Sequence, residues 1–243
     1  NMQEGGGPKG VFSRRCIIFG GPLIQEEAPN AAEILEALLD KLDEATSSIY
    51  SEFRNHYDLS AYQSIFEQKG YEYNPHLNFI VSVQNNAEES MKLLSSSKRR
   101  QVRKSLKSGA EIREAENMQE VEAFYLILKE LYETKVQKPL APFSFFEQFF
   151  QLPDTGKYLL IFHEGEVVGG IMCPIYKETI YEWYIAGLDG TIQNVYPSIL
   201  ATWAPIAYAS ENGLKYFDFM GAGKPDDDYG GRGFKSKFGG ELV

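Results

Sequence analysis

Apolar positions in the first 85 residues switch between the spacing of strands and the spacing of helices. A β-rich run at residues 11–19 ends in Gly-Gly-Pro, and apolar residues then recur at helical spacing after Asn30. Residues 48–53 predict a short strand, and residues 58–70 predict a second helix. Alternation at residues 77–83 predicts the strand that closes a β-α-β-α-β block.

After residue 86 the pattern predicts a second, longer block. Its expected elements are, in chain order, a helix at 86–108, a strand at 111–113, helices at 118–135 and about 143–150, strands at 157–163, 167–176 and 179–186, a helix at 196–212 and a strand at 214–219. An antiparallel meander that leads into a helical crossover is typical of an α+β domain. Because the first block repeats the last part of the second, we expect a duplicated domain: an incomplete first copy at residues 1–85 and a second copy at 86–243.

Charge is distributed unevenly along the chain. The net charge of −10 argues against a whole surface that binds nucleic acid or anionic lipid. Residues 92–107, however, contain seven Lys or Arg and no acidic residue, which leaves 17 basic against 34 acidic residues elsewhere. This helix therefore predicts a polyanion-binding face, with an ordinary solvated helix face as the alternative. The cations expected to form it are Lys98, Arg99, Arg100, Arg103 and Lys104.

Cysteine and histidine positions predict neither a disulfide framework nor a metal site. Cys16 and Cys173 stand far apart, and the three histidines lack metal-ligand spacing. We therefore expect no bound metal and a reduced, cytoplasmic compartment. No apolar run approaches the roughly 18 residues of a membrane-spanning helix.

Four sequence motifs carry a resemblance to a known family. They are SKRRQVRK at residues 97–104, YPSILATW at 196–203, ENGLKYFDFMGAG at 211–223 and GFKSKFG at 233–239. In this order they resemble the FemABX family, bacterial peptidoglycan-bridge aminoacyltransferases built from two tandem GNAT-like domains. The resemblance implies the GNAT-like fold and transfer of an amino acid from an aminoacyl-tRNA to an amine on a peptidoglycan precursor, without a cofactor.

The glycine-rich tail predicts the reaction centre. Glycines at 230, 231 and 233 let the backbone approach a ligand, and Arg232, Lys235 and Lys237 supply cations. Acyl transfer to an amine builds negative charge on oxygen, which a lysine would stabilise. By the family resemblance, Lys235 is assigned to the oxyanion or leaving group and Phe234 to the shape of the pocket. The alternative is a mobile basic tail that neutralises the neighbouring aspartates 226–228.

Other candidates surround this centre. Asp218 ends a predicted strand and would position the attacking amine or orient Lys235; a carboxylate that stabilises a turn is the alternative. Glu182 and Tyr184 share one face of a predicted strand, and Glu182 is a reserve general base. The predicted substrate-binding residues are Arg232, Tyr184, Glu182, Tyr196 and Gly221.

Two other functions compete with aminoacyl transfer. An ordinary GNAT enzyme would use acyl-CoA as its donor and would cradle the pyrophosphate in a glycine-rich turn before the crossover helix. This chain instead has Tyr196, Pro197 and Ser198 there, which argues against CoA binding at that place. The second competitor is a non-catalytic GNAT-like module that binds a polyanion through the basic helix.

Overall fold

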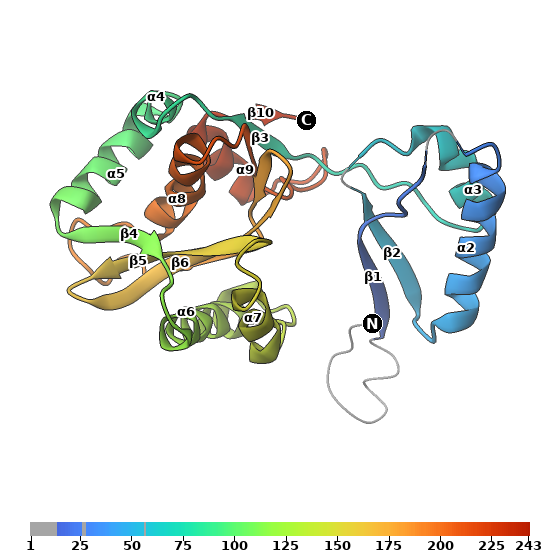
Figure 1. Ribbon diagram of the computed structural model, residues 1–243, viewed down its shortest axis with the longest axis horizontal. Helices are drawn as coiled ribbons and strands as arrows, with labels where there is room; N and C mark the ends of the chain where they lie inside the picture. The colour runs from blue at the N-terminus through green and yellow to red at the C-terminus, as the bar shows by residue number, and fades with distance from the viewer. Residues whose placement is uncertain (1–13, 26–27, 56) are drawn as a thin grey trace. The chain divides into compact units, whose positions relative to one another are not determined.

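The computed structural model describes residues 14–25, 28–55 and 57–243, which form parts of two compact units (Figure 1). Unit 1 is Asn1–Asn74 and unit 2 is Pro75–Val243. Residues 11–13 of the first predicted strand lie outside the described residues.

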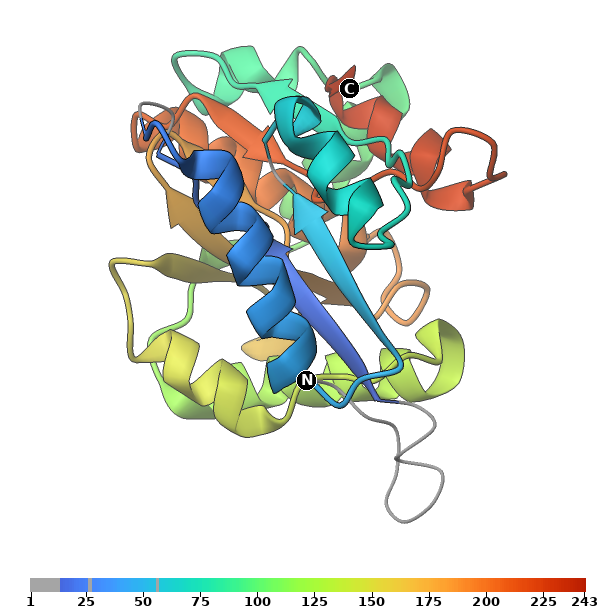
Figure 2. The same cartoon turned by 90° about the vertical axis from the view of Figure 1, so that its right-hand side faces the viewer.

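Unit 1 is built on a parallel pair of strands, β1 (Arg15–Gly20) and β2 (Tyr50–Asn55). Helix α2 (Ala31–Ala45) connects them and runs alongside the strands (Figure 2). The short helices η1 (Ser60–Tyr62) and α3 (Gln63–Gln68) follow. The β-α-β-α order predicted for this part of the chain is confirmed in the described residues.

Unit 2 is organised around one mixed sheet with the strand order β10-β3-β9-β7-β6-β5-β4, in which β8 also pairs with β6. Its strands are β3 (Phe79–Ser82), β4 (Ala110–Glu114), β5 (Gly156–His163), β6 (Glu166–Tyr176), β7 (Thr179–Tyr181), β8 (Tyr184–Gly187), β9 (Tyr216–Asp218) and β10 (Glu241–Leu242). Strands β7 and β9 pair in parallel, whereas the other neighbours are antiparallel. The predicted α+β class is confirmed.

Helices cover both faces of this sheet. They are α4 (Ala87–Met91), α5 (Ser96–Lys107), α6 (Met118–Leu131) with the π-helical turn η2 (Tyr132–Val136), α7 (Phe143–Phe150), α8 (Pro197–Glu211), α9 (Gly230–Lys235) and η3 (Ser236–Phe238). Helices α6 and α7 lie on one face, and α4, α5 and α8 lie on the other (Figure 1). Each face buries its own apolar core, because apolar side chains of the central strands alternate between them. Within the described ranges, no helix combines the length and apolar character needed to cross a membrane.

The strand predicted at residues 77–83 does not close the first block. Strand β3 pairs instead with β9 and β10, so it belongs to unit 2. Phe79 and Val81 bury their side chains in the core of that unit. The structural division therefore falls after Asn74 rather than after residue 85. That unit 1 is an incomplete GNAT-like copy stays a prediction.

The helix predicted at residues 86–108 is two helices. Two polar caps divide it: Asn86 Oδ1 accepts the N–H of Glu89, and Ser95 Oγ accepts the N–H of Lys98. Each caps a separate N-terminus, so α4 ends at Met91 and α5 begins at Ser96. The prediction of one continuous helix is therefore wrong. It arose because the helical spacing of apolar residues persists across the junction between the two helices.

The strand predicted at residues 179–186 is interrupted. Ile180 pairs with Ile175 of β6, and Tyr184 pairs with Met172 of β6. Between these two pairs, the segment from β7 to β8 therefore contains one more residue than β6 does. The extra residue breaks the alternation of faces, as in a β-bulge. Glu182 and Tyr184 therefore do not continue along one strand, and Glu182 lies in the gap between β7 and β8.

Candidate functional site

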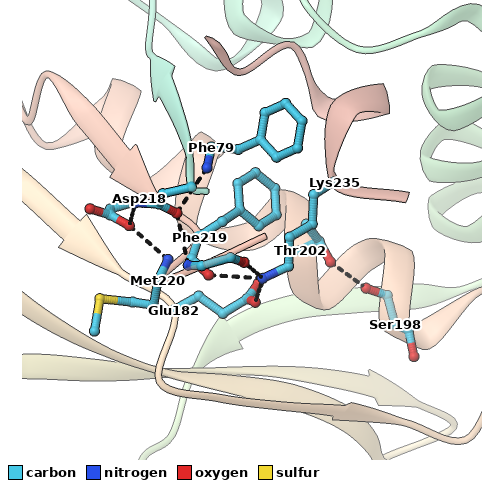
Figure 3. A network of polar contacts seen from close by, with 10 residues as sticks. Phe79, Glu182, Ser198, Thr202, Asp218, Phe219, Met220 and Lys235 are labelled. Carbon is cyan, nitrogen blue, oxygen red and sulfur yellow. Dashed lines mark hydrogen bonds and ion pairs between the residues drawn. The ribbon is translucent and has the colours of Figure 1, made fainter. Parts of the chain in front are cut away.

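Lys235 lies at the end of α9 with its ammonium group in a buried cage (Figure 3). Its Nζ donates to the carbonyl oxygens of Phe219 and Gly221 at 2.8 and 2.9 Å. It also forms an ion pair with Glu182 Oε1 at 2.9 Å, and only 13% of its side chain is exposed. These three acceptors match the three protons of an ammonium group, so the orientation of the Lys235 ammonium group is fixed.

Glu182 faces Lys235 from the gap between β7 and β8. Its N–H donates to the carbonyl oxygen of Asp218 at 2.9 Å, which ties the interrupted strand to the end of β9. Burial raises the pKa of the Glu182 carboxyl; Lys235 opposes the shift, and the negative charge of Asp218 adds to it. The carboxylate is therefore a better proton acceptor than an exposed glutamate would be.

Asp218 acts on the backbone of the loop that follows β9. Its Oδ1 accepts the N–H of Met220 and the side-chain amide of Asn78, both at 2.7 Å. Asn78 Oδ1 in turn accepts the N–H of Gly221 at 2.8 Å. These bonds hold Met220 at φ 57° and Gly221 at φ 131°, a value that favours glycine. Asn78 and Asp218 therefore fix the loop whose carbonyl groups hold Lys235.

Arg232 and Phe234 also pack within the tail. Arg232 Nε donates to the carbonyl oxygen of Ala222 at 3.1 Å, and its other guanidinium nitrogens reach the carbonyl oxygens of Lys224 and Pro225. Phe234 packs on Phe238 with ring centroids 5.1 Å apart. The tail thus makes specific contacts, which argue against the alternative of a mobile basic tail.

We call the groups around the Lys235 ammonium, which are Glu182 and the carbonyl groups of Phe219 and Gly221, the lysine cage. Tyr184 and Tyr196 lie outside it. Tyr184 packs among aromatic rings of α7 and η2, with the Phe146 and Tyr132 centroids at 4.9 and 6.1 Å. Tyr196 lies at the start of α8, where its N–H donates to Ser105 Oγ at 3.0 Å. Of the predicted site residues, the structure brings Lys235, Glu182 and Gly221 together directly, and Asp218 joins them through the loop.

The first turn of α8 has its donors in use. Besides the bond from Tyr196 to Ser105, the N–H of Ser198 donates to Asp189 Oδ1 at 3.1 Å. Pro197 between them has no N–H to donate. A carboxylate of the chain itself therefore stands where the N-terminus of a helix would otherwise attract an anion.

Replacing Ser105 with alanine is expected to lower the free energy of unfolding by about 1–3 kcal/mol, because the N–H of Tyr196 would lose its buried acceptor. Ser105 is fully buried and also donates to the carbonyl oxygen of Gln101 at 2.9 Å. Urea denaturation measures the change. Ser96→Ala, at an exposed position of the same helix, is the control and should stay within about 0.5 kcal/mol of the parent. Equal stability of both variants would contradict the prediction.

The basic helix α5 presents most of its cations to solvent, but Lys98 is an exception. Arg100, Arg103 and Lys104 are exposed, and Arg99 is half-buried. Lys98 is only 9% exposed, with Nζ 4.2 Å from the centre of the Phe234 ring. Burial lowers the pKa of Lys98, as does the charge of Lys237. The prediction that Lys98 belongs to the exposed basic face is therefore corrected: its side chain points to the tail.

Several site residues escaped the sequence analysis. Asn78 lies in the strand predicted at residues 77–83, and Asp189 lies outside the predicted helices and strands. No local pattern distinguishes their bonds from those of ordinary polar residues. The position of Lys98 did carry a signal. In the helix predicted at residues 86–108 it stands four residues after Leu94 and four before Val102, and so lies on the predicted apolar stripe.

Several solved structures share this architecture. FemX aligns with a TM-score of 0.70 and 14% identity, covering 94% of this chain and 78% of FemX. L-PGS from Bacillus licheniformis aligns with a TM-score of 0.62 and 14% identity, covering 94% and 75%. The C-terminal domain of a protein assigned as a lysylphosphatidylglycerol synthetase, from Agrobacterium fabrum, aligns with a TM-score of 0.63 and 11% identity, covering 94% and 75%. At these identities the likeness establishes the fold.

The family follows from the sequence model of the acetyltransferase (GNAT) domain, which matches residues 96–235, more than half of the chain. No curated protein gives a significant match. The chain belongs to the acetyltransferase (GNAT) domain family and has the predicted GNAT-like fold. The family match indicates an acyltransferase. Lys235 and Glu182 both fall within the matched region, so the lysine cage is our candidate active site.

Proposed function

We propose that this protein transfers an aminoacyl group from an aminoacyl-tRNA to an amine, as the FemABX resemblance implies, with a peptidoglycan precursor as the acceptor. The observation that carries the proposal is the buried Lys235–Glu182 pair at the interruption between β7 and β8. It combines a hydrogen-bond donor for developing negative charge with a carboxylate that accepts a proton.

The reaction follows from this pair. The neutral amine attacks the ester carbonyl carbon, so that a C–N bond forms and the C–O bond to the terminal ribose breaks. Lys235 gives up its hydrogen bond to one of the two backbone carbonyl oxygens. It donates instead to the substrate oxygen on which negative charge collects. The proton lost by the amine passes to Glu182 and from there to the departing ribose oxygen. The products are an amide and a free ribose hydroxyl, and no covalent enzyme intermediate or metal is invoked.

Aminoacyl-tRNA is preferred over acyl-CoA as the donor because of the start of α8. Asp189 and Ser105 already accept N–H groups there, and a CoA pyrophosphate at this place would meet a carboxylate. The name lysylphosphatidylglycerol synthetase, given to one structural relative, also describes a joined lysyl group. The description of the matched family as acetyltransferases keeps acyl-CoA as the second candidate donor.

Neutralising three exposed cations of α5 tests the contribution of tRNA. The association constant for tRNA falls as salt rises. In the variant Arg100→Gln, Arg103→Gln, Lys104→Gln the plot of log K against log salt should be less steep by about two to three, because each cation that meets a phosphate releases about one counterion. Filter binding or fluorescence anisotropy at several salt concentrations measures the slope.

The control variant removes three lysines elsewhere, Lys41→Gln, Lys177→Gln, Lys215→Gln, and should retain the parent slope. The same loss of slope in both variants would mean that only net charge matters and would contradict a binding face on α5.

The donor is decided by comparing substrates directly. The protein is incubated with pools of radioactively charged tRNA, and separately with acyl-CoA, each in the presence of peptidoglycan-precursor peptides and simple amines. Label transferred from charged tRNA to an amine supports the proposal. Turnover with acyl-CoA alone would overturn it in favour of an ordinary GNAT acyltransferase, and tRNA binding without any turnover would favour the non-catalytic module.

A further inference from the structure

The junction between α4 and α5 grips the tail that carries Lys235. The N–H of Ser95 donates to the carbonyl oxygen of Lys237 at 2.8 Å. Gly239, at φ 89°, lies so close to Leu93 that a Cβ on it would come within 2.6 Å of the Leu93 Cβ. These two contacts fix the chain on the C-terminal side of Lys235. The break in the helix at this junction therefore makes room for the tail.

Lys98 provides the contact on the N-terminal side of Lys235. Its Nζ lies 4.2 Å from the centre of the Phe234 ring and 5.7 Å from that of Phe238. Among the described residues, Asp189 attracts this ammonium group electrostatically, but none accepts a hydrogen bond from it. A desolvated cation over an aromatic face is attracted by the ring quadrupole more strongly than an exposed one is. The charge of Lys98 is therefore directed to the aromatic rings of the tail.

We infer that Lys98 is a positioning residue for the reaction: by holding the Phe234 ring, it sets the rotation of α9 and so delivers the Lys235 ammonium to Glu182 and the loop carbonyls. Phe234 directly precedes Lys235, so a turn of α9 that moves the ring also moves the lysine. The inference rests on the proposed function for its kinetic test only, because the order of α9 can be measured without a substrate.

The test compares Lys98→Met, which keeps an unbranched side chain of similar length without the charge, with Lys98→Arg, which keeps the charge. Lys107→Met, at an exposed position of the same helix, is the control. Amide hydrogen exchange is measured in peptides covering residues 230–238 and, for reference, α6. Lys98→Met should speed exchange in 230–238 about tenfold and leave α6 within about twofold, whereas Lys98→Arg and Lys107→Met should match the parent.

Kinetics then separate positioning from general stability. With a donor that supports turnover, Lys98→Met should lower kcat about tenfold with KM unchanged within about twofold, and Lys98→Arg should restore kcat. Unchanged exchange in residues 230–238 of Lys98→Met would overturn the inference, as would equally faster exchange in α6. Absence of turnover with every donor would defeat the proposed function and leave the exchange result to decide the role of Lys98.

Discussion

Replacing Lys235 with methionine is expected to lower kcat about 100- to 1000-fold, the usual loss when one preorganised donor to an oxyanion is removed. Methionine keeps most of the side-chain length but cannot donate to the substrate oxygen. The variant also leaves the Glu182 carboxylate buried without its ion-pair partner. Steady-state kinetics with the donor identified by the substrate comparison measures the effect.

Two further variants separate chemistry from stability. Lys237→Met changes an exposed lysine two residues away and should retain nearly all of the activity. The double variant Lys235→Met, Glu182→Gln removes the orphaned charge, so it should recover much of the stability lost in the single variant while kcat stays low. A Lys235→Met enzyme with more than half of the parent kcat would refute the assigned role.

Replacing Phe217 with alanine is expected to lower the free energy of unfolding of unit 2 by about 3–5 kcal/mol, as for other buried phenylalanines. Its side chain is completely buried in β9, with the Phe219 ring centroid 4.6 Å away. The loss should extend to the site, because the same strand continues into Asp218 and Phe219. Urea denaturation measures the loss, and amide exchange in peptides from β3 and β9 assigns it to unit 2.

The neighbouring residue is the matched control. Tyr216 stands on the same strand but is 39% exposed, so Tyr216→Ala should cost less than about 1 kcal/mol. A similar loss in both variants would show that β9 is stabilised by its backbone pairing and would contradict the predicted dependence on the buried ring.

Local patterns predicted most of the individual elements. Helices α7 and α8 and strands β5 and β6 lie where the sequence predicted them, because each is a run of apolar residues bounded by turn signals. The motifs indicated the GNAT-like fold, and the glycine-rich tail drew attention to Lys235. These features depend on residues close together in the chain, which is why the sequence alone indicated them.

Pairings between distant segments could not be predicted in the same way. Strand β3 alternates like any half-buried strand, and nothing in it specifies β9 as its partner. The run from Tyr181 to Tyr184 is rich in strand-forming aromatic residues, so the extra residue that places Glu182 opposite Lys235 is not apparent from composition. The site depends on such long-range choices, whereas the fold class does not.

The bond between Asn78 and Asp218 joins residues 140 positions apart, which has a consequence for how the protein folds. The β5–β6 hairpin needs only a two-residue turn and can form early, whereas closing so large a loop costs more chain entropy. The lysine cage is therefore expected to assemble late in folding, after the central hairpin. Interactions formed after the transition state act mainly on the unfolding rate, so the Asn78–Asp218 bond governs how long an active molecule survives more than how fast one is made.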